Sequence, residues 1–303
     1  MGDLTFVWSS FFIGIYLMQY LYQIADIQIL CDIPFNVQIC KESKDFVCEM
    51  ENCFSRDLTV LFQSVKQLEQ VEEKGIWDID RYHVCKNLKR KVYYCPAPYC
   101  EPYACVSWDN EEKAILRCRY IEGKEYYLNY SRNLCDIIAL DSLLLRYQGL
   151  LLHSSFIRWN SQGLLFSAPS GTGKSTQADL WVKYEGAEII NGDRAGLRKL
   201  DKGWTAYGLP YAGSSGVYRN ESAPVKSIIV LRQAKENRIR PLGPAEAVRY
   251  LYPEITVHQW DSDFVKQVMD LLTDLVLNIP IYLLECLPDQ GAVDLVKRTI
   301  FEK

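Results

Sequence analysis

The sequence lacks the net charge that would draw it to nucleic acid or to an anionic membrane. Its 303 residues carry 34 lysines and arginines against 38 aspartates and glutamates, a formal net charge of -4. A general attraction to polyanions needs a strongly basic surface. We therefore expect no nucleic-acid partner, and binding must come from local sites.

Closely spaced cysteine pairs are also missing, although the chain has 11 cysteines. The closest spacing leaves four intervening residues, as between Cys95, Cys100 and Cys105, and ten of the eleven precede residue 136. Structural zinc sites usually bring their ligands in C-x-x-C pairs. The odd count, without an evident cleavable signal, favours reduced and mostly buried thiols. We expect a cytoplasmic protein whose front and rear parts differ.

Basic residues are absent before the apolar run at residues 4–22. The run is close to the minimum length that spans a bilayer, but it has no positive n-region of the kind that precedes a signal peptide. Three alternatives stay open: a helix packed on the chain's own core, a stretch outside the folding unit, and a membrane anchor. Membrane contact is expected only through these residues, and we treat residues 1–24 as a separate apolar segment.

Residues 25–147 form a smaller β-rich region in which we find no recognisable chemistry. Runs such as ACVSWD, AILRCRY and EYYLNYS, separated by turn-like DNEEK and EGK, predict an antiparallel meander. Between Asn133 and Gly149, apolar residues recur at helical spacing. This spacing predicts one helix that links the region to residues 148–303.

A glycine-rich segment in residues 148–303 carries the chemistry. Residues 168–175, APSGTGKS, follow a buried strand, run into a helix and match the P-loop pattern G-x-x-x-x-G-K-[ST], except that Ala168 replaces the first glycine. Such a loop cradles phosphates with backbone N–H groups, a helix N-terminus and a lysine, here Lys174, while the Ser175 hydroxyl suits Mg²⁺. The predicted ligands are ATP and Mg²⁺. The candidate nucleotide-binding residues are Ser170, Gly171, Thr172, Gly173, Lys174, Ser175 and Thr176.

The order of elements after the loop predicts the kind of sheet. Asp193 lies 19 residues beyond Lys174, at the end of the next apolar strand. A hairpin pattern with an Asp-Lys-Gly turn at residues 201–203 and a strand at residues 226–232 follow, with no helix between them. We therefore predict an α/β (mixed α+β) fold with a P-loop and a mixed, partly antiparallel sheet, rather than a doubly wound sheet.

These segments resemble the catalytic domain of HPr kinase/phosphorylase and, more distantly, the ATP-type phosphoenolpyruvate carboxykinases. The resemblance rests on LLHSSFIRW (151–159), APSGTGKST (168–176), INGDR (190–194) and GLPYAGSSG (208–216). It implies that residues 148–303 form a nucleotide-binding catalytic domain. It also implies that His153 and Asp193 are catalytic and that Ser175 and Asp193 contact the metal. The family has a pair of acids where this chain has Gly192 and Asp193, so one carboxylate is missing, and neither HPr as substrate nor phosphorolysis is inherited.

The predicted function is transfer of the γ-phosphoryl group of Mg-ATP to a hydroxyl acceptor, either a serine of a peptide or protein or a small molecule. Asp193 would ligate Mg²⁺ or accept the acceptor's proton, and His153 could share the second role. A core histidine and a simple turn aspartate are the structural alternatives for these two residues. Ser214 and Ser215 could close on the acceptor. Because Gly192 supplies no acid, a non-catalytic nucleotide-binding regulatory module remains the alternative function.

Overall fold

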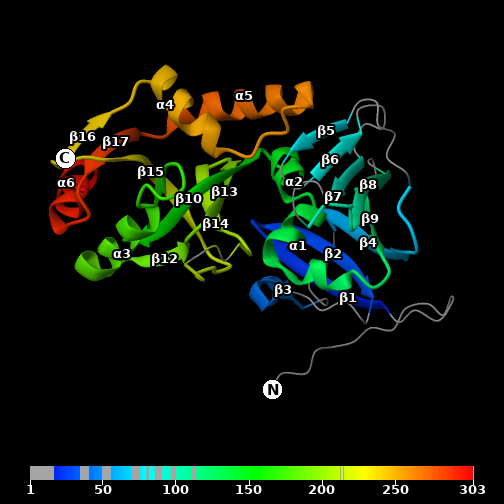
Figure 1. Ribbon diagram of the computed structural model, residues 1–303. Coiled ribbons are helices and arrows are strands. Elements are labelled where there is room, and N and C mark those ends of the chain that lie inside the picture. Colours follow the sequence, from blue (N-terminus) through cyan, green and yellow to red (C-terminus); the bar gives the residue numbers. More distant parts are fainter. Residues whose placement is uncertain are drawn as a thin grey trace. The chain divides into compact units, whose positions relative to one another are not determined.

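The structure, a computed structural model, is of mixed α/β type and divides into two compact units, Met1–Ala139 and Leu140–Lys303 (Figure 1). It describes residues 17–34, 41–49, 56–69, 76–79, 82–85, 91–96, 100–110, 114–211, 213 and 215–302. The single linking helix expected up to Gly149 is wrong. Two short helices, α1 (Ser131–Ile137) and α2 (Leu140–Arg146), lie there. Ala139 between them has φ +48°, a left-handed conformation that no continuous α-helix contains.

The described strands of unit 1 form one nine-stranded sheet in the order β3-β1-β2-β4-β9-β8-β7-β6-β5. From β7 to β9 it is the expected antiparallel meander, which continues through β6 to β5, two strands that the sequence did not predict. Strand β4 pairs in parallel with both β2 and β9. EYYLNYS is not a strand, because its first five residues form the 3₁₀ helix η3 (Glu125–Asn129). A second 3₁₀ helix, η1, spans Lys41–Phe46. The strands are β1 (Leu17–Ile24), β2 (Ile27–Pro34), β3 (Val47–Cys48), β4 (Leu58–Val65), β5 (Ile76–Ile79), β6 (Tyr82–Cys85), β7 (Lys91–Tyr94), β8 (Ala104–Asn110) and β9 (Ile115–Ile121).

The apolar N-terminal run enters this sheet where the structure describes it. Residues 17–22 belong to strand β1, which pairs with β2 along its full length, so neither the expected helix nor a helical anchor exists there. Leu21, Tyr22 and Ile24 are buried. Residues 4–16 lie outside the described residues. Among the described helices, none is both long enough and apolar enough to cross a membrane.

The described cysteines contribute thiols to the interior of unit 1. Cys31 on β2 and Cys118 on β9 are fully buried, and burial raises the pKa of both thiols well above the ordinary value. Burial also raises the pKa of the Cys105 thiol to about 11. The cysteines found as free thiols are Cys31, Cys48, Cys95, Cys100, Cys105, Cys118, Cys135 and Cys286.

The described strands of unit 2 form a mixed eight-stranded sheet, in agreement with the expected partly antiparallel arrangement. The predicted hairpin is present as β13 and β14. The strands are β10 (Gly149–Trp159), β11 (Gln162–Ser167), β12 (Glu188–Asn191), β13 (Arg194–Leu200), β14 (Gly203–Gly208), β15 (Ser222–Gln233), β16 (Arg238–Pro241) and β17 (Ile281–Cys286). The helices are α3 (Lys174–Glu185), α4 (Pro244–Leu251), η4 (Tyr252–Glu254), α5 (Ser262–Asn278) and α6 (Gln290–Phe301).

Strand β10 changes partner half-way along its length. Residues 149–153 pair with β13, and residues 154–159 pair with β11. Strand β15 does the same, because residues 222–224 pair with β14 and residues 225–230 pair with β11. The pairing therefore runs from β11 through β10, β13, β14 and β15 back to β11. The fork on β10 lies between His153 and Ser154.

Two hydrophobic cores cover the sheet of unit 2. One contains α4 and α5 residues such as Leu251 and Leu272. The other contains α3 and α6 residues such as Trp181 and Val293. Trp181 is fully buried and meets the ring of Trp159 edge-on, with centroids 5.4 Å apart. This packing fixes α3 against the sheet and so fixes where its N-terminus lies.

Candidate functional site

The glycine loop, residues 168–173, joins the end of β11 to the start of α3, as the sequence predicts. Gly171 (φ +78°) and Gly173 (φ +115°) adopt backbone conformations that favour glycine. The N–H of Thr172 donates to the carbonyl of Pro169 at 3.3 Å. The amide of Gln233, at the end of β15, donates to the Thr172 carbonyl at 3.3 Å. The loop is therefore a tight turn held both from within and from the neighbouring strand.

Lys174 is the first residue of α3 and is 7% exposed. Its ammonium donates to the carbonyl of Ala168 at 2.7 Å and to that of Pro169 at 3.3 Å. Burial lowers the pKa of this ammonium below its usual range, although the nearby carboxylates of Glu254 and Asp193 act in the opposite direction. A buried cation hydrogen-bonded to two carbonyl oxygens, at a helix N-terminus, is suited to receive an anion.

The structure brings all the predicted loop residues together. Ser170, Gly171 and Thr176 are exposed, whereas Thr172, Gly173 and Ser175 are half-buried. They lie in the glycine loop and in the first turn of α3, where backbone N–H groups have no helical partner.

Asp193 is fixed by a buried residue that the sequence analysis did not single out. Asn191, at the end of β12, is fully buried, and its Oδ1 accepts from the backbone N–H groups of Asp193 (2.9 Å) and Arg194 (3.0 Å). Its Nδ2 donates to the carbonyls of Leu209 (2.7 Å) and Tyr211 (3.2 Å). One amide thus ties the turn that carries Asp193 to the loop after β14. An asparagine before a Gly-Asp turn is the only sequence signal for this role.

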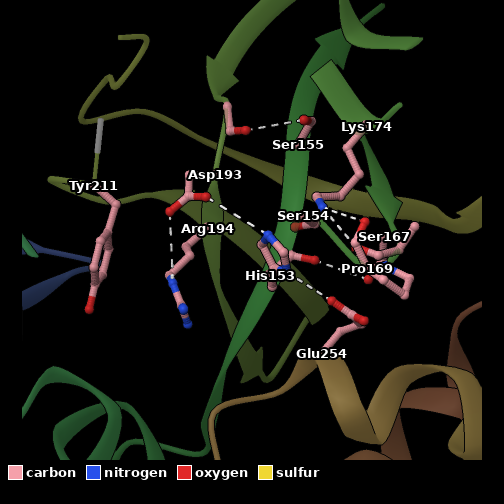
Figure 2. Close-up of polar contacts among 12 residues, drawn as sticks. His153, Ser154, Ser155, Ser167, Pro169, Lys174, Asp193, Arg194, Tyr211 and Glu254 are labelled. Atoms are coloured by element: carbon pink, nitrogen blue, oxygen red, sulfur yellow. Dashed lines mark hydrogen bonds and ion pairs between the residues drawn. The ribbon is translucent and has the colours of Figure 1, made fainter. Parts of the chain in front are cut away.

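His153, at the fork of β10, lies between two carboxylates (Figure 2). Its Nδ1 is 2.8 Å from Oε2 of Glu254, and its Nε2 is 3.9 Å from Oδ1 of Asp193. An ionised carboxylate only accepts, so Nδ1 carries the proton in this pair. His153 and Asp193 therefore meet, and the imidazole has a defined orientation.

Glu254 is the site residue that sequence reasoning missed. It ends the short helix η4, lies 101 residues from His153 along the chain, and its side chain is 9% exposed. The same segment is tied to the site by Thr256, whose hydroxyl accepts from Nη1 of Arg194 at 2.9 Å. A lone glutamate after a Tyr-Pro pair gives no signal of such a contact.

Ser215 takes up the space beside Gly192, where the resembled family has an acid. A Cβ added to Gly192 would lie 1.8 Å from Oγ of Ser215 and 2.6 Å from its Cβ. Gly213 packs against Asp193 in the same way, because its Cβ would lie 2.5 Å from that of Asp193. The loop after β14 thus lies directly against the Gly192-Asp193 turn. Ser214 lies outside the described residues.

Comparison of the sequence with models of known protein families identifies its family. The family model described as "SynChlorMet cassette protein ScmC" matches residues 127–289, which is more than half of the chain. The chain belongs to the ScmC family. No curated protein matches the sequence of this ScmC-family chain significantly. Among solved structures, the HPr(Ser) kinase/phosphatase from Coxiella burnetii is similar at 12% identity and a TM-score of 0.30, over 50% of this chain and 97% of that chain. At that TM-score the likeness says nothing about activity.

The oxygen donors of this ScmC-family site fit a hard divalent cation. Mg²⁺ prefers oxygen ligands and is usually held by one or two carboxylates together with substrate phosphates. The predicted metal residues offer a hydroxyl, from Ser175 in the first turn of α3, and a carboxylate, from Asp193 in the turn between β12 and β13. Both are donor types that Mg²⁺ takes in proteins, and the cation itself stays a prediction.

Proposed function

We propose that residues 148–303 bind Mg-ATP on the glycine loop and transfer its γ-phosphoryl group to a hydroxyl acceptor, either a serine of a peptide or protein or a small molecule. The observation that carries this proposal is the buried ammonium of Lys174 at the start of α3, hydrogen-bonded to two carbonyls of its own loop. A phosphate oxygen offers that ammonium a charged partner in their place. The loop geometry supports the same role.

Catalysis would consist mainly of positioning and charge neutralisation. The N–H groups of the glycine loop and the Lys174 ammonium would hold the β- and γ-phosphates. The Ser175 hydroxyl would hold Mg²⁺, which neutralises phosphate charge when it is bound. The acceptor oxygen would attack the γ-phosphorus, the bond to the bridging oxygen would break, and ADP would leave.

The acceptor's proton would pass to the Asp193 carboxylate. Of its two predicted roles, base and metal ligand, its contacts favour the first: Oδ1 faces His153 and Oδ2 lies 3.8 Å from Nε of Arg194. Nε2 of His153 could then share that proton. Glu254 would act through His153 and is a positioning residue.

The alternative function is a nucleotide-binding regulatory module without turnover, and the absence of an acid at Gly192 favours it. Calorimetry with ATP, and ATP turnover with free serine, a serine-containing peptide and water as acceptors, separate the two. The kinase predicts turnover that Asp193→Asn abolishes while nucleotide binding is retained. Tight binding with no turnover for any of these acceptors supports the module, and no binding contradicts both.

A further inference from the structure

A hollow of about 260 Å³ lies against the first turns of α3, beside the glycine loop. Three hydroxyl groups line it, from Ser155 on β10, Ser175 on α3 and Ser215 in the loop after β14. One carboxylate, that of Asp179, lines it as well. The remaining lining residues are Ala178, Ile189, Gly192 and Val217.

Asp179 shares a face of α3 with the predicted metal ligand Ser175. The two are four residues apart, so their side chains lie one above the other on the helix surface. Asp179 is exposed, and within the described part of the chain no hydrogen bond or ion pair engages its carboxylate. The same holds for the Ser175 hydroxyl. Both groups are available to a ligand in the hollow.

The neighbouring residues offer no second carboxylate. Gly192 has no side chain, and Ser215 fills the space where one would begin. The Asp193 carboxylate faces His153 and Arg194 instead. What the turn does add to the hollow is oxygen: the Gly192 carbonyl accepts from the Ser155 hydroxyl at 3.3 Å.

We propose that Asp179 supplies the carboxylate that holds the divalent cation accompanying the nucleotide, from one helical turn beyond Ser175. Hydroxyl and carboxylate oxygens are the donors that Mg²⁺ takes in proteins. The inference deepens the proposed function and rests on nucleotide binding at the glycine loop. In this proposal the two acids have different roles: Asp179 binds the cation, and Asp193 accepts the proton of the acceptor hydroxyl.

The test measures, by calorimetry on the full chain, the Kd of a non-hydrolysable ATP analogue at increasing Mg²⁺ and in EDTA. Asp179→Asn removes the negative charge but keeps the shape. The matched control is Asp270→Asn, an equally exposed helical aspartate on α5. We expect Asp179→Asn to raise the Mg²⁺ concentration for half-maximal tightening by about 10-fold or more, since even indirect partners of a metal are worth that much. Its Kd in EDTA should match that of the wild type.

Two outcomes would contradict the inference, and they are distinguishable. Wild-type protein that binds no analogue under any condition overturns the nucleotide site and this inference with it. Wild-type protein that binds with a Mg²⁺ dependence which Asp179→Asn and Asp270→Asn leave equally unchanged overturns only the role of Asp179. Thermal unfolding of both variants, expected to match the wild type because both side chains are exposed, checks that the fold is retained.

Discussion

The two units differ in where they bury polar groups. In the described part of unit 1 the buried polar residues are Ser43, Ser107 and Asn133, spread over three elements, and the interior is built from tyrosine, cysteine and aliphatic side chains. In the described part of unit 2, most buried polar residues gather around β10, β11, β12 and α3, as Ser154, Ser155, Ser167, Lys174, Gln177 and Asn191, and one more, Ser227, lies on β15. Burying a polar group costs free energy unless it is hydrogen-bonded. Their concentration near the fork in β10 agrees with the proposal that the site lies in unit 2.

We expect the largest effect when a carboxylate is removed from unit 2, and no effect when one is removed from the surface of unit 1. Asp193→Ala should lower phosphoryl transfer by about 100-fold or more, as expected when a catalytic base is lost. His153→Ala should cost less and change the acidic limb of the pH–rate profile. Asp109→Ala, at an exposed ion pair with Arg117 in unit 1, should leave the rate unchanged. A near-normal rate for Asp193→Ala would contradict the proposed catalytic role of Asp193, and only the proposed phosphate-binding role of the glycine loop would remain.

We expect an aspartate in place of a glycine to lower the free energy of unfolding more in the tightly packed loop of unit 2 than at an open turn of unit 1. Gly192→Asp forces its side chain into Ser215, and we expect it to lower the free energy of unfolding by about 1–3 kcal/mol, the usual cost of overpacking. Adding Ser215→Gly should restore most of that loss. Gly123→Asp in unit 1 meets open space at φ +83°, so it should cost only the left-handed strain of about 1 kcal/mol. Denaturant unfolding measures all three, and a lack of rescue would contradict the contact.

Replacing one lysine in each unit compares their contributions to nucleotide affinity. Lys174 is buried, which its position in the sequence does not reveal, so Lys174→Met is the variant that keeps the packing of its stem. We expect it to weaken Mg-ATP binding by about 10-fold or more, because a charge-assisted contact is lost. Lys91→Met, at a surface ion pair with Glu69 in unit 1, should leave the affinity unchanged. If calorimetry gave Lys174→Met the same affinity for Mg-ATP as the wild type, the proposed nucleotide site would be contradicted.

Glu254→Gln should have a smaller effect on turnover. The amide keeps the shape but not the charge that orients Nδ1–H of His153, so kcat should fall by about 10-fold, less than a catalytic group contributes. The Kd for ATP should stay the same, and the acidic limb of the pH–rate profile should change shape. A variant with normal kcat and only a lower melting temperature would assign Glu254 to stability alone.

Alkylation of native thiols should have the smallest effect. At pH 8, iodoacetamide should label Cys100, which is exposed, and leave Cys31 and Cys118 unlabelled. Their raised pKa keeps these thiols protonated, and the thiolate is the reactive form. Peptide mass spectrometry reads the pattern, and ATP binding should not change. Labelling of Cys31 or Cys118 in the native protein would contradict their burial.

The parts of the site that depend on neighbouring residues in the chain were predictable. A buried strand, a glycine cluster and a helix start, all within residues 163–175, form the loop as predicted, because a turn of this kind needs only local φ angles. Glu254 and Ser215 act through contacts with residues distant in sequence, and so does the Nδ2 group of Asn191, which reaches the loop after β14. Their residue types are common in loops, so no local pattern distinguishes them.

The fold shows the same limit. The β7–β9 part of the meander and the β13–β14 hairpin follow from short-range patterns, whereas the parallel pairs of β4 join strands that are not consecutive. The turn between β1 and β2 uses Ala25 and Asp26, both at positive φ, where glycine or asparagine is the usual signal. Without that signal, the sequence predicts a separate apolar segment that includes the residues of β1.

The contact between Gly192 and Ser215 also constrains how the family can vary. Position 192 is not free to gain a side chain alone, since that side chain needs the space that Ser215 holds. Among ScmC-family sequences the two positions should therefore covary, with a larger residue at 192 accompanied by glycine at 215. A sequence with any side chain at 192 would have to lose it before, or together with, the arrival of a serine at 215, so the packing of this loop limits the order of the two changes.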